Sequence, residues 1–208
     1  MQKHYSMEDL FNFPKNTVIK TNEKLNFKTS KKINTKDLRQ TTRDDNFNDL
    51  MKDLGGFPNQ KEYFAIKTNG TSDCGSIFTY ALQQWEEITE MYLATWTISK
   101  QNIKRLKEAV ESGKLKNLTM VFSSTLKGAN PALYASLVGA LKDFENVKLK
   151  EINSHAKTFS ITNGKEYITV SGSANWSENP RIENFLILND KNLFEHHKDW
   201  MSELTDLI

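Results

Sequence analysis

Short apolar runs alternate with helical patterns along the chain from residue 62 onward. The runs have the length of buried β-strands, and apolar residues between them recur every three or four positions, as in amphipathic helices. The predicted strands occupy residues 63–67, 91–98, 118–122 and 147–152. Because strands alternate with helices, the pattern predicts an α/β fold in which helices flank a largely parallel central sheet.

Capping residues predict where two of these helices begin and end. Ser99 can cap a helix that Gly113 ends. Asn130 followed by Pro131 is a cap with proline at the first helical position, so a further helix is expected to begin there. These signals support the helical assignments independently of the apolar periodicity.

The segment 70–76, GTSDCGS, leads from the first strand into a helix predicted at residues 76–88. A helix N-terminus at this position could bind an anion. A simpler interpretation is a strand-to-helix turn in which Ser72 or Asp73 caps the helix. We favour the turn.

The last third of the chain predicts a hairpin, a final strand and a closing helix. Strands at residues 155–161 and 166–171 flank the turn signal Asn163-Gly164. A strand at residues 182–188 follows, and an amphipathic helix ends the chain. Because a hairpin is antiparallel, we expect the sheet to be mixed rather than wholly parallel.

Residues 1–60 differ in character, with scattered apolar positions and many Lys, Asn and Thr. Their clearest element is a helix at residues 46–54, followed by the stop signal Gly55-Gly56. Basic residues between positions 28 and 43 could contact phosphates or form a solvated arm. We therefore predict an N-terminal extension, partly irregular, over residues 1–60 and a main domain over residues 61–208.

Composition narrows the class of protein without selecting a substrate. A chain of 208 residues, 38% hydrophobic and 26% charged, is typical of a soluble globular domain. No apolar run is long enough to span a membrane, and the first residues lack the apolar stretch of a secretory signal. The net charge of +2 does not by itself indicate nucleic-acid binding, but it does not oppose a polyanionic substrate.

Cys74 is the only cysteine, so neither a disulfide nor a thiolate metal cluster can form within one chain. We expect Cys74 to be a small buried residue. Together with the composition, this favours a cytoplasmic protein, bacterial or encoded by a phage.

The candidate chemistry lies in the stretch that begins at His155. His155 and Lys157 are two residues apart on a predicted strand and should point to the same face. The turn after the hairpin contains Ser173 and Asn175. A cation, a hydroxyl and a carboxamide around an imidazole suit a phosphate bound beside a nucleophile or base. Glu183 could accept a hydrogen bond from the other imidazole nitrogen and fix its tautomer.

Taken singly, each of these residues is ordinary, but their combination resembles the signature of the phospholipase D superfamily. That signature is HxKx4D, then GSxN, then a downstream Glu. The matching positions are His155 and Lys157, then Gly172, Ser173 and Asn175, then Glu183. The position of the signature Asp is occupied by Thr162, beside the hairpin turn. The resemblance covers the chain from about residue 62 to its end.

The resemblance implies a phospholipase D-like half-domain that cleaves phosphodiesters in two displacements at phosphorus. One histidine attacks to give a phosphohistidine, and a second histidine protonates the departing oxygen. The family needs no metal or other cofactor, and we expect none here. No cluster of His, Cys and carboxylate residues has convincing ligand spacing.

The chain carries one motif, whereas the mechanism requires two histidines. His196 and His197 lie in a predicted helix without a GSxN partner, so we interpret them as surface residues. Single-motif relatives bring two motifs together by dimerising. We therefore predict a homodimer with one composite site, to which each chain contributes the motif residues.

Three hypotheses for the function remain. A metal-independent endonuclease, with DNA favoured over RNA and no membrane insertion, fits the single motif and the slightly basic balance. A non-catalytic nucleic-acid-binding or phage structural member of the family is an alternative because Thr162 replaces the signature Asp. A lipid-directed phosphodiesterase is a second alternative, although such enzymes usually carry two motifs in a longer chain. A fold alone does not decide among these.

Overall fold

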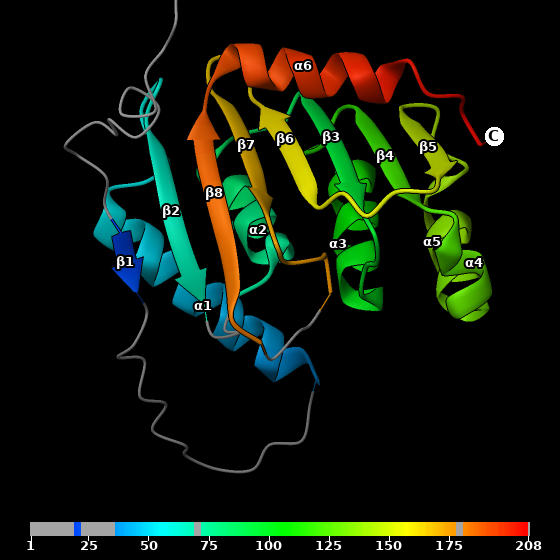
Figure 1. The fold of residues 1–208 in the computed structure, drawn as a ribbon, viewed down its shortest axis with the longest axis horizontal. Coiled ribbons are helices and arrows are strands. Elements are labelled where there is room, and N and C mark those ends of the chain that lie inside the picture. Colours follow the sequence, from blue (N-terminus) through cyan, green and yellow to red (C-terminus); the bar gives the residue numbers. More distant parts are fainter. Residues whose placement is uncertain (1–18, 22–35, 69–71, 178–180, 208) are drawn as a thin grey trace, which may run out of the picture.

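The computed structural model describes residues 19–21, 36–68, 72–177 and 181–207. A sheet of eight strands, in the order β1-β2-β8-β7-β6-β3-β4-β5, forms the centre of the molecule (Figure 1). The strands are β1 (Ile19–Thr21), β2 (Tyr63–Thr68), β3 (Glu90–Thr95), β4 (Leu118–Ser123), β5 (Val147–Ile152), β6 (Thr158–Thr162), β7 (Tyr167–Gly172) and β8 (Glu183–Asn189). The helices are α1 (Lys36–Leu54), α2 (Cys74–Gln84), α3 (Lys100–Glu111), α4 (Thr125–Ala129), α5 (Pro131–Leu141) and α6 (Lys191–Ser202).

The sheet is mixed, as the sequence predicts. Strands β1, β2, β3, β4, β5 and β7 run in one direction, and β6 and β8 run in the other. Most strands are therefore parallel in direction, although four of the seven pairings are antiparallel. The reason is that β6 and β8 each lie between two strands of the opposite direction. The predicted α/β class is confirmed.

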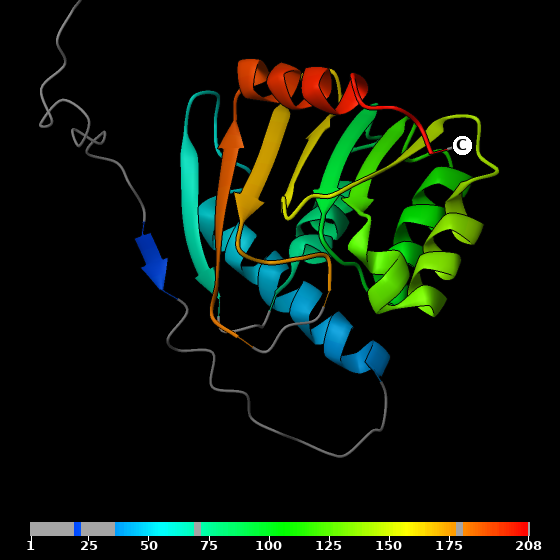
Figure 2. The same ribbon diagram turned by 45° about the vertical axis from the view of Figure 1, so that its right-hand side comes forward.

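Helices cover both faces of the sheet. Helix α6 lies across one face (Figures 1 and 2). Its side chains Phe194 and Met201 belong to one apolar cluster with Tyr92, Ala94 and Val121 of the sheet. The remaining helices lie on the opposite side, where the larger core forms. In the described part of the chain, no helix combines the length and the apolar composition needed to cross a membrane.

Most helix ends follow the predicted caps. Ser99 accepts a hydrogen bond from the amide of Asn102, and Asn130 accepts one from the amide of Leu133. Gly113 follows α3 with φ of 71°, a conformation that glycine adopts at little cost. Helix α2 ends at Gln84, four residues before the predicted end, and the short helix α4 was not predicted.

The turn before α2 has the predicted structural role. The carboxylate of Asp73 accepts a hydrogen bond from the amide of Ser76, at 3.0 Å, and so caps the helix. Of the segment 70–76, residues 70 and 71 lie outside the described residues. The described part supports the interpretation of this segment as a capped turn.

Helix α1 ends where predicted but begins ten residues before the predicted start at position 46. Its last turns bury Phe47, Leu50 and Met51 in the same core as the residues of α2. The basic side chains between positions 28 and 43 lie outside the described residues, so their role is still a prediction. The domain boundary near residue 60 is also still a prediction. Helix α1 lies before that boundary and packs on the main core.

A buried polar network links α1 to the body of the protein. Arg105, on α3, forms an ion pair with Asp44 of α1, and it donates to the side-chain oxygen of Asn102 at 3.4 Å. The Asn102 amide donates to Asp73 at 3.3 Å and to the backbone oxygen of Trp176 at 3.0 Å. Burial raises the pKa of Asp73, and Arg105 acts in the opposite direction. The network therefore ties together four segments that are distant in sequence.

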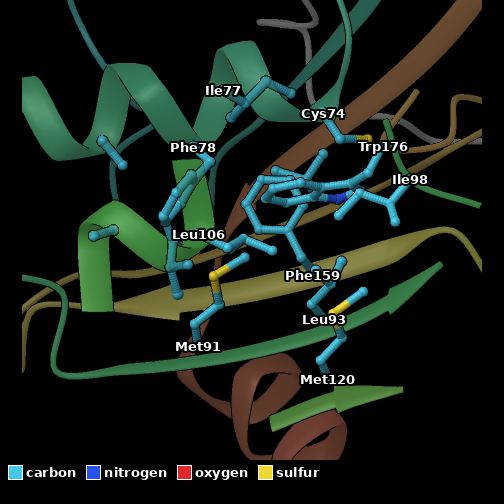
Figure 3. Close-up of a cluster of buried hydrophobic side chains, with 14 of the residues drawn as sticks. Cys74, Ile77, Phe78, Met91, Leu93, Ile98, Leu106, Met120, Phe159 and Trp176 are labelled. Atoms are coloured by element: carbon cyan, nitrogen blue, oxygen red, sulfur yellow. The ribbon is translucent and has the colours of Figure 1, made fainter. Parts of the chain in front are cut away.

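Trp176 lies at the centre of the larger core. Its ring contacts Phe78 and Phe159, with centroid distances of 5.6 and 5.2 Å, and Cys74 and Ile98 lie close by (Figure 3). Trp176 immediately follows the residues GSAN. Its burial therefore anchors that turn to the hydrophobic interior.

Candidate functional site

Three adjacent strands bring the motif residues together. His155 and Lys157 precede β6, Gly172 ends β7, and Glu183 begins β8. Because β6 and β8 run opposite to β7, the beginnings of β6 and β8 lie beside the end of β7. The amide of Gly172 donates to the backbone oxygen of Lys157, at 3.3 Å. The HxK, GSxN and Glu elements therefore meet at one end of the sheet.

His155 and Lys157 lie in the segment before β6 and not on the strand itself, which corrects the predicted strand start. The ammonium nitrogen of Lys157 lies 3.0 Å from Nδ1 and 3.3 Å from Nε2 of His155, and it also donates to the backbone oxygen of His155 at 3.1 Å. An ammonium group can only donate hydrogen bonds. The contact therefore places a cation beside the His155 ring, within reach of both of its nitrogens.

The environment of Lys157 favours binding of an anion. Partial burial lowers the pKa of Lys157, because removal of water disfavours the ammonium form, and nearby Glu183 acts in the opposite direction. A bound phosphate would supply a second negative charge next to the ammonium. Lys157 is therefore suited to hold a phosphoryl oxygen beside His155.

Ser173 and Glu183 are joined across β7 and β8. The Ser173 hydroxyl donates to the Glu183 carboxylate, and it accepts a hydrogen bond from the amide of Asn184 at 3.1 Å. A Cβ atom on Gly172 would overlap the backbone oxygen of Asn184, so only glycine allows the two strands to approach this closely. Glu183 thus fixes the GSxN turn. Its predicted contact with the imidazole of His155 is still a prediction.

Asn175 lies in the turn just before the buried Trp176. Its side-chain oxygen is buried and finds no hydrogen-bond partner among the described residues. A buried carbonyl oxygen without a partner costs about 1–3 kcal/mol and can be paired only by a hydrogen-bond donor, so a phosphoryl oxygen would have to bind the NH2 group of Asn175 instead. Of the five predicted site residues, Asn175 is the one whose side chain is not tied to another of them.

Cys74 lies beneath the site and is buried, as predicted. Its thiol donates to the backbone oxygen of Ala174, at 3.4 Å, within the GSxN turn. Burial raises the pKa of the thiol well above its ordinary value, so Cys74 is held in the neutral form. Its contact with Ala174 makes it a support of the turn.

Thr162, at the position where the resemblance would place an Asp, has a different role from the predicted site residues. It ends β6 at the opposite end from His155. Its hydroxyl donates to the backbone oxygen of Glu166 at 2.7 Å and accepts from the amide of Gly164 at 3.0 Å. Thr162 therefore closes the hairpin turn.

Trp96 is a further residue at this end of the sheet that the sequence pattern did not single out. It follows β3 directly, and its indole lies against the ring of His155, with centroids 5.3 Å apart. The run 91–98 was predicted to be a strand, which placed Trp96 inside the strand. Because β3 ends at Thr95, the indole is instead free to lie beside the site.

The second pair of histidines lies on α6. His196 is exposed, as predicted, whereas His197 is half-buried, so the prediction that it is a surface residue is wrong. Its Nδ1 atom lies 2.8 Å from the hydroxyl of Ser160 on β6. The hydroxyl of Ser160 in turn lies 2.8 Å from that of Thr169 on β7. His197 therefore helps to dock α6 on the sheet.

The docking of His197 predicts a pH dependence of stability. Burial, and secondarily His196, lower the pKa of His197 from 6.5, so the unfolded chain takes up the proton first as pH falls. The free energy of unfolding should therefore be highest above about pH 6.5 and decrease below it. Urea unfolding between pH 5 and pH 8 measures this. In His197→Gln the free energy of unfolding should depend less on pH than in wild type, whereas in His196→Gln it should depend on pH as in wild type. An unchanged slope in His197→Gln would contradict the assignment.

No group of three or more His, Cys, Asp or Glu side chains in the described part of the chain is arranged to hold a metal ion. Among the motif side chains, the groups that can donate a hydrogen bond to an anion are the Lys157 ammonium and the NH2 group of Asn175, because the Ser173 hydroxyl already donates to Glu183.

Comparison with known proteins identifies the fold. No protein-family model and no curated protein matches the sequence. Phosphatidylserine synthase from Haemophilus influenzae Rd KW20 is similar in structure, with a TM-score of 0.53 and 14% identity over 86% of this chain and 48% of the synthase. Polyphosphate kinase from Porphyromonas gingivalis is similar with a TM-score of 0.46 and 16% identity, over 76% of this chain and 24% of the kinase.

The chain thus spans about half the length of the synthase and about a quarter of the kinase. At such low identity, the likeness to the synthase concerns the fold. It confirms the predicted mixed α/β fold, and it leaves the substrate open.

Proposed function

We propose that this chain is a metal-independent nuclease that cleaves phosphodiesters through a phosphohistidine, at a site shared by two copies of the chain in the cytoplasm. The observation that carries the proposal is the contact between the Lys157 ammonium and the His155 ring, beside the Ser173–Glu183 pair. A nucleophilic histidine needs a free nitrogen and a neighbouring cation for the phosphate. The proposal is supported by the position of the Lys157 ammonium, which lies within 3.3 Å of both ring nitrogens at the junction of β6, β7 and β8.

The proposed reaction has two displacements, as in the phospholipase D superfamily. A nitrogen of His155 attacks phosphorus while the bond to the leaving oxygen breaks, and the second histidine gives that oxygen a proton. Water then loses a proton to the second histidine and attacks phosphorus, which breaks the phosphorus–nitrogen bond and releases His155. Lys157 and Asn175 hold the phosphoryl oxygens throughout, and Ser173 and Glu183 hold the turn that carries Asn175.

The second histidine comes from a partner copy in this proposal. The described chain presents one HxK motif that is followed by GSxN, so a twofold axis near His155 would supply the acid. Two exposed apolar side chains support such an interface: Ile182, just before β8, is 79% exposed, and Leu186, on the exposed face of β8, is 41% exposed. The likeness to about half of the synthase's length agrees with a half-site that needs a second copy.

Two alternatives follow from particular observations. The structural likeness to an enzyme named for phosphatidylserine keeps a lipid-directed phosphodiesterase as a candidate. The hairpin role of Thr162, at the position of the signature Asp, keeps a non-catalytic nucleic-acid-binding or phage structural protein as another. Both make predictions that differ from those of a nuclease.

A substrate panel in excess EDTA separates the three functions. The purified protein is incubated with plasmid DNA, single-stranded DNA, RNA and vesicles that contain a phospholipid labelled in its headgroup. We expect cleavage of nucleic acid that EDTA does not diminish. Strict dependence on added Mg²⁺, Mn²⁺ or Zn²⁺ would overturn the mechanism. Release of headgroup without nucleic-acid cleavage would select the lipid function, and binding of nucleic acid without turnover would select the non-catalytic one.

A further inference from the structure

An exposed aromatic ring lies beside the candidate nucleophile. Trp96 is 40% exposed, and its indole centroid lies 5.3 Å from the imidazole centroid of His155. All four tryptophans fall within the described residues. The other three are buried or partly buried in the two hydrophobic cores. Trp96 is therefore the tryptophan that is placed to contact another molecule.

A hydrogen bond to a neighbouring side chain fixes the orientation of this indole. Its Nε1 donates to the hydroxyl of Thr125, at 3.1 Å, and that hydroxyl lies 2.8 Å from the hydroxyl of Ser123. Ser123 is buried at the end of β4. Because the N–H group is already bonded to Thr125, Trp96 offers a ligand the flat face of its ring. A face held in one orientation can stack on another planar group at a low entropic cost.

The chemistry of the neighbouring site indicates which planar group this is. When His155 attacks a phosphorus atom, the groups that flank that phosphorus extend past the adjacent indole. In a nucleic acid each flanking group is a sugar that carries a flat base, and bases stack on aromatic side chains whatever their sequence. In a lipid, acyl chains flank the phosphate on one side, and they require a broad apolar surface and not a single ring.

Stacking on Trp96 also restricts the state of the nucleic acid. In a duplex both faces of each base are covered by neighbouring bases, so a base must leave the stack before it can contact a side chain. A single strand, a loop or a frayed end meets this condition without the cost of unpairing.

We propose that Trp96 stacks on an unpaired base next to the scissile phosphate, so that the substrate is single-stranded or locally unpaired nucleic acid. This inference rests on the proposed nuclease function and adds the class of substrate to it. Trp96 is then a specificity residue, and it leaves the chemistry to His155.

A double-mutant cycle, in which Trp96 is replaced in the protein and a base is removed from the substrate, tests the stacking directly. The cleavage position is first mapped on a fluorescent single-stranded oligonucleotide in EDTA. Stable abasic residues are then placed, one at a time, at the positions that flank the cleaved bond. Wild type, Trp96→Ala and Trp96→Phe are compared by kcat/KM on each strand and on the matching duplex.

We expect Trp96→Ala to lower kcat/KM on the intact strand by about 5-fold to 100-fold, the range for loss of one base–aromatic stack. One flanking abasic residue should cause a similar loss in wild type and no further loss in Trp96→Ala, because both changes remove the same interaction. Trp96→Phe should keep most of the activity, since phenylalanine also stacks. The duplex should be cleaved more slowly than the strand by wild type.

Several results would overturn the inference while leaving the nuclease intact. Equal losses on intact and abasic strands would mean that the indole acts through His155. A Phe variant as weak as the Ala variant would point to the hydrogen bond with Thr125. Dissociation of a dimer by Trp96→Ala, seen in sedimentation, would mean that a partner chain covers the ring. If wild type cleaves no nucleic acid at all, the proposed function itself is overturned.

Discussion

Replacement of His155 by alanine should lower kcat/KM for EDTA-resistant cleavage by about 10⁴-fold or more, because the variant loses the nucleophile in one copy and the proton donor in the other. Binding should change little, since Lys157 and Asn175 still hold the phosphate. The measurements are initial rates on a labelled single strand and fluorescence anisotropy for binding. His196→Ala is the matched control, because His196 is exposed on α6 and outside the motif. A His155→Ala protein that keeps more than about a tenth of the wild-type rate would exclude His155 as nucleophile.

Mixed dimers extend this result to the composite site. Wild-type and His155→Ala chains are unfolded together, refolded at equal amounts and assayed per wild-type chain. If each site needs His155 from both copies, about a quarter of the dimers are active by random pairing, so activity per wild-type chain is halved. Unchanged activity per wild-type chain would show that one copy is sufficient. Sedimentation of a fully active monomer would have the same meaning.

Replacement of Arg105 by methionine should lower the free energy of unfolding by about 3–5 kcal/mol, the usual cost of removing one partner from a buried ion pair. The variant removes the guanidinium that forms an ion pair with the largely buried Asp44 carboxylate. Arg105 also contacts Asn102, and Asn102 joins Asp73 to the backbone of Trp176. The loss of stability should therefore extend to the GSxN turn. Urea unfolding followed by circular dichroism at pH 7 measures the loss of stability.

Two further variants show whether the effect of Arg105→Met comes from its ion pair with Asp44. Lys104→Met changes a neighbouring charge whose ion pair with Glu108 is largely exposed, so its cost should stay below about 1 kcal/mol. Asp44→Leu combined with Arg105→Met removes both charges, and it should recover much of the stability that the single change loses. If Arg105→Met costs no more than Lys104→Met, the network does not anchor α1.

The positions of the elements could be predicted from the sequence to a large extent. The helix that Ser99 caps and the one that Asn130 and Pro131 open depend on contacts within one turn of the chain, so their starts were correct. The hairpin at Asn163-Gly164 is equally local. Element ends that depend on packing were less accurate. The start of α1 and the end of β3 at Thr95 are examples.

The motif residues were also recognised in the sequence, because their spacing is itself the signal. In the structure His155 and Lys157 precede β6, Ser173 and Asn175 follow β7, and Glu183 begins β8, whereas the sequence predicted His155 and Lys157 to lie on a strand. The role of His197 was misjudged because its contact with Ser160 joins a helix to a strand 37 positions away. No local pattern carries that information.

The sequence alone determined the α/β class, the helix caps and the set of residues with candidate chemistry, because propensity, periodicity and motif spacing are properties of short segments. Only the tertiary structure decided which side chains from distant parts of the sequence contact one another. It placed the Lys157 ammonium on the His155 ring, the Trp96 indole against the same ring, and Arg105 between Asp44 and Asn102. These contacts depend on how antiparallel β6 and β8 insert among parallel strands and on how α1 packs, and such long-range pairings are fixed by the whole core rather than by any one segment.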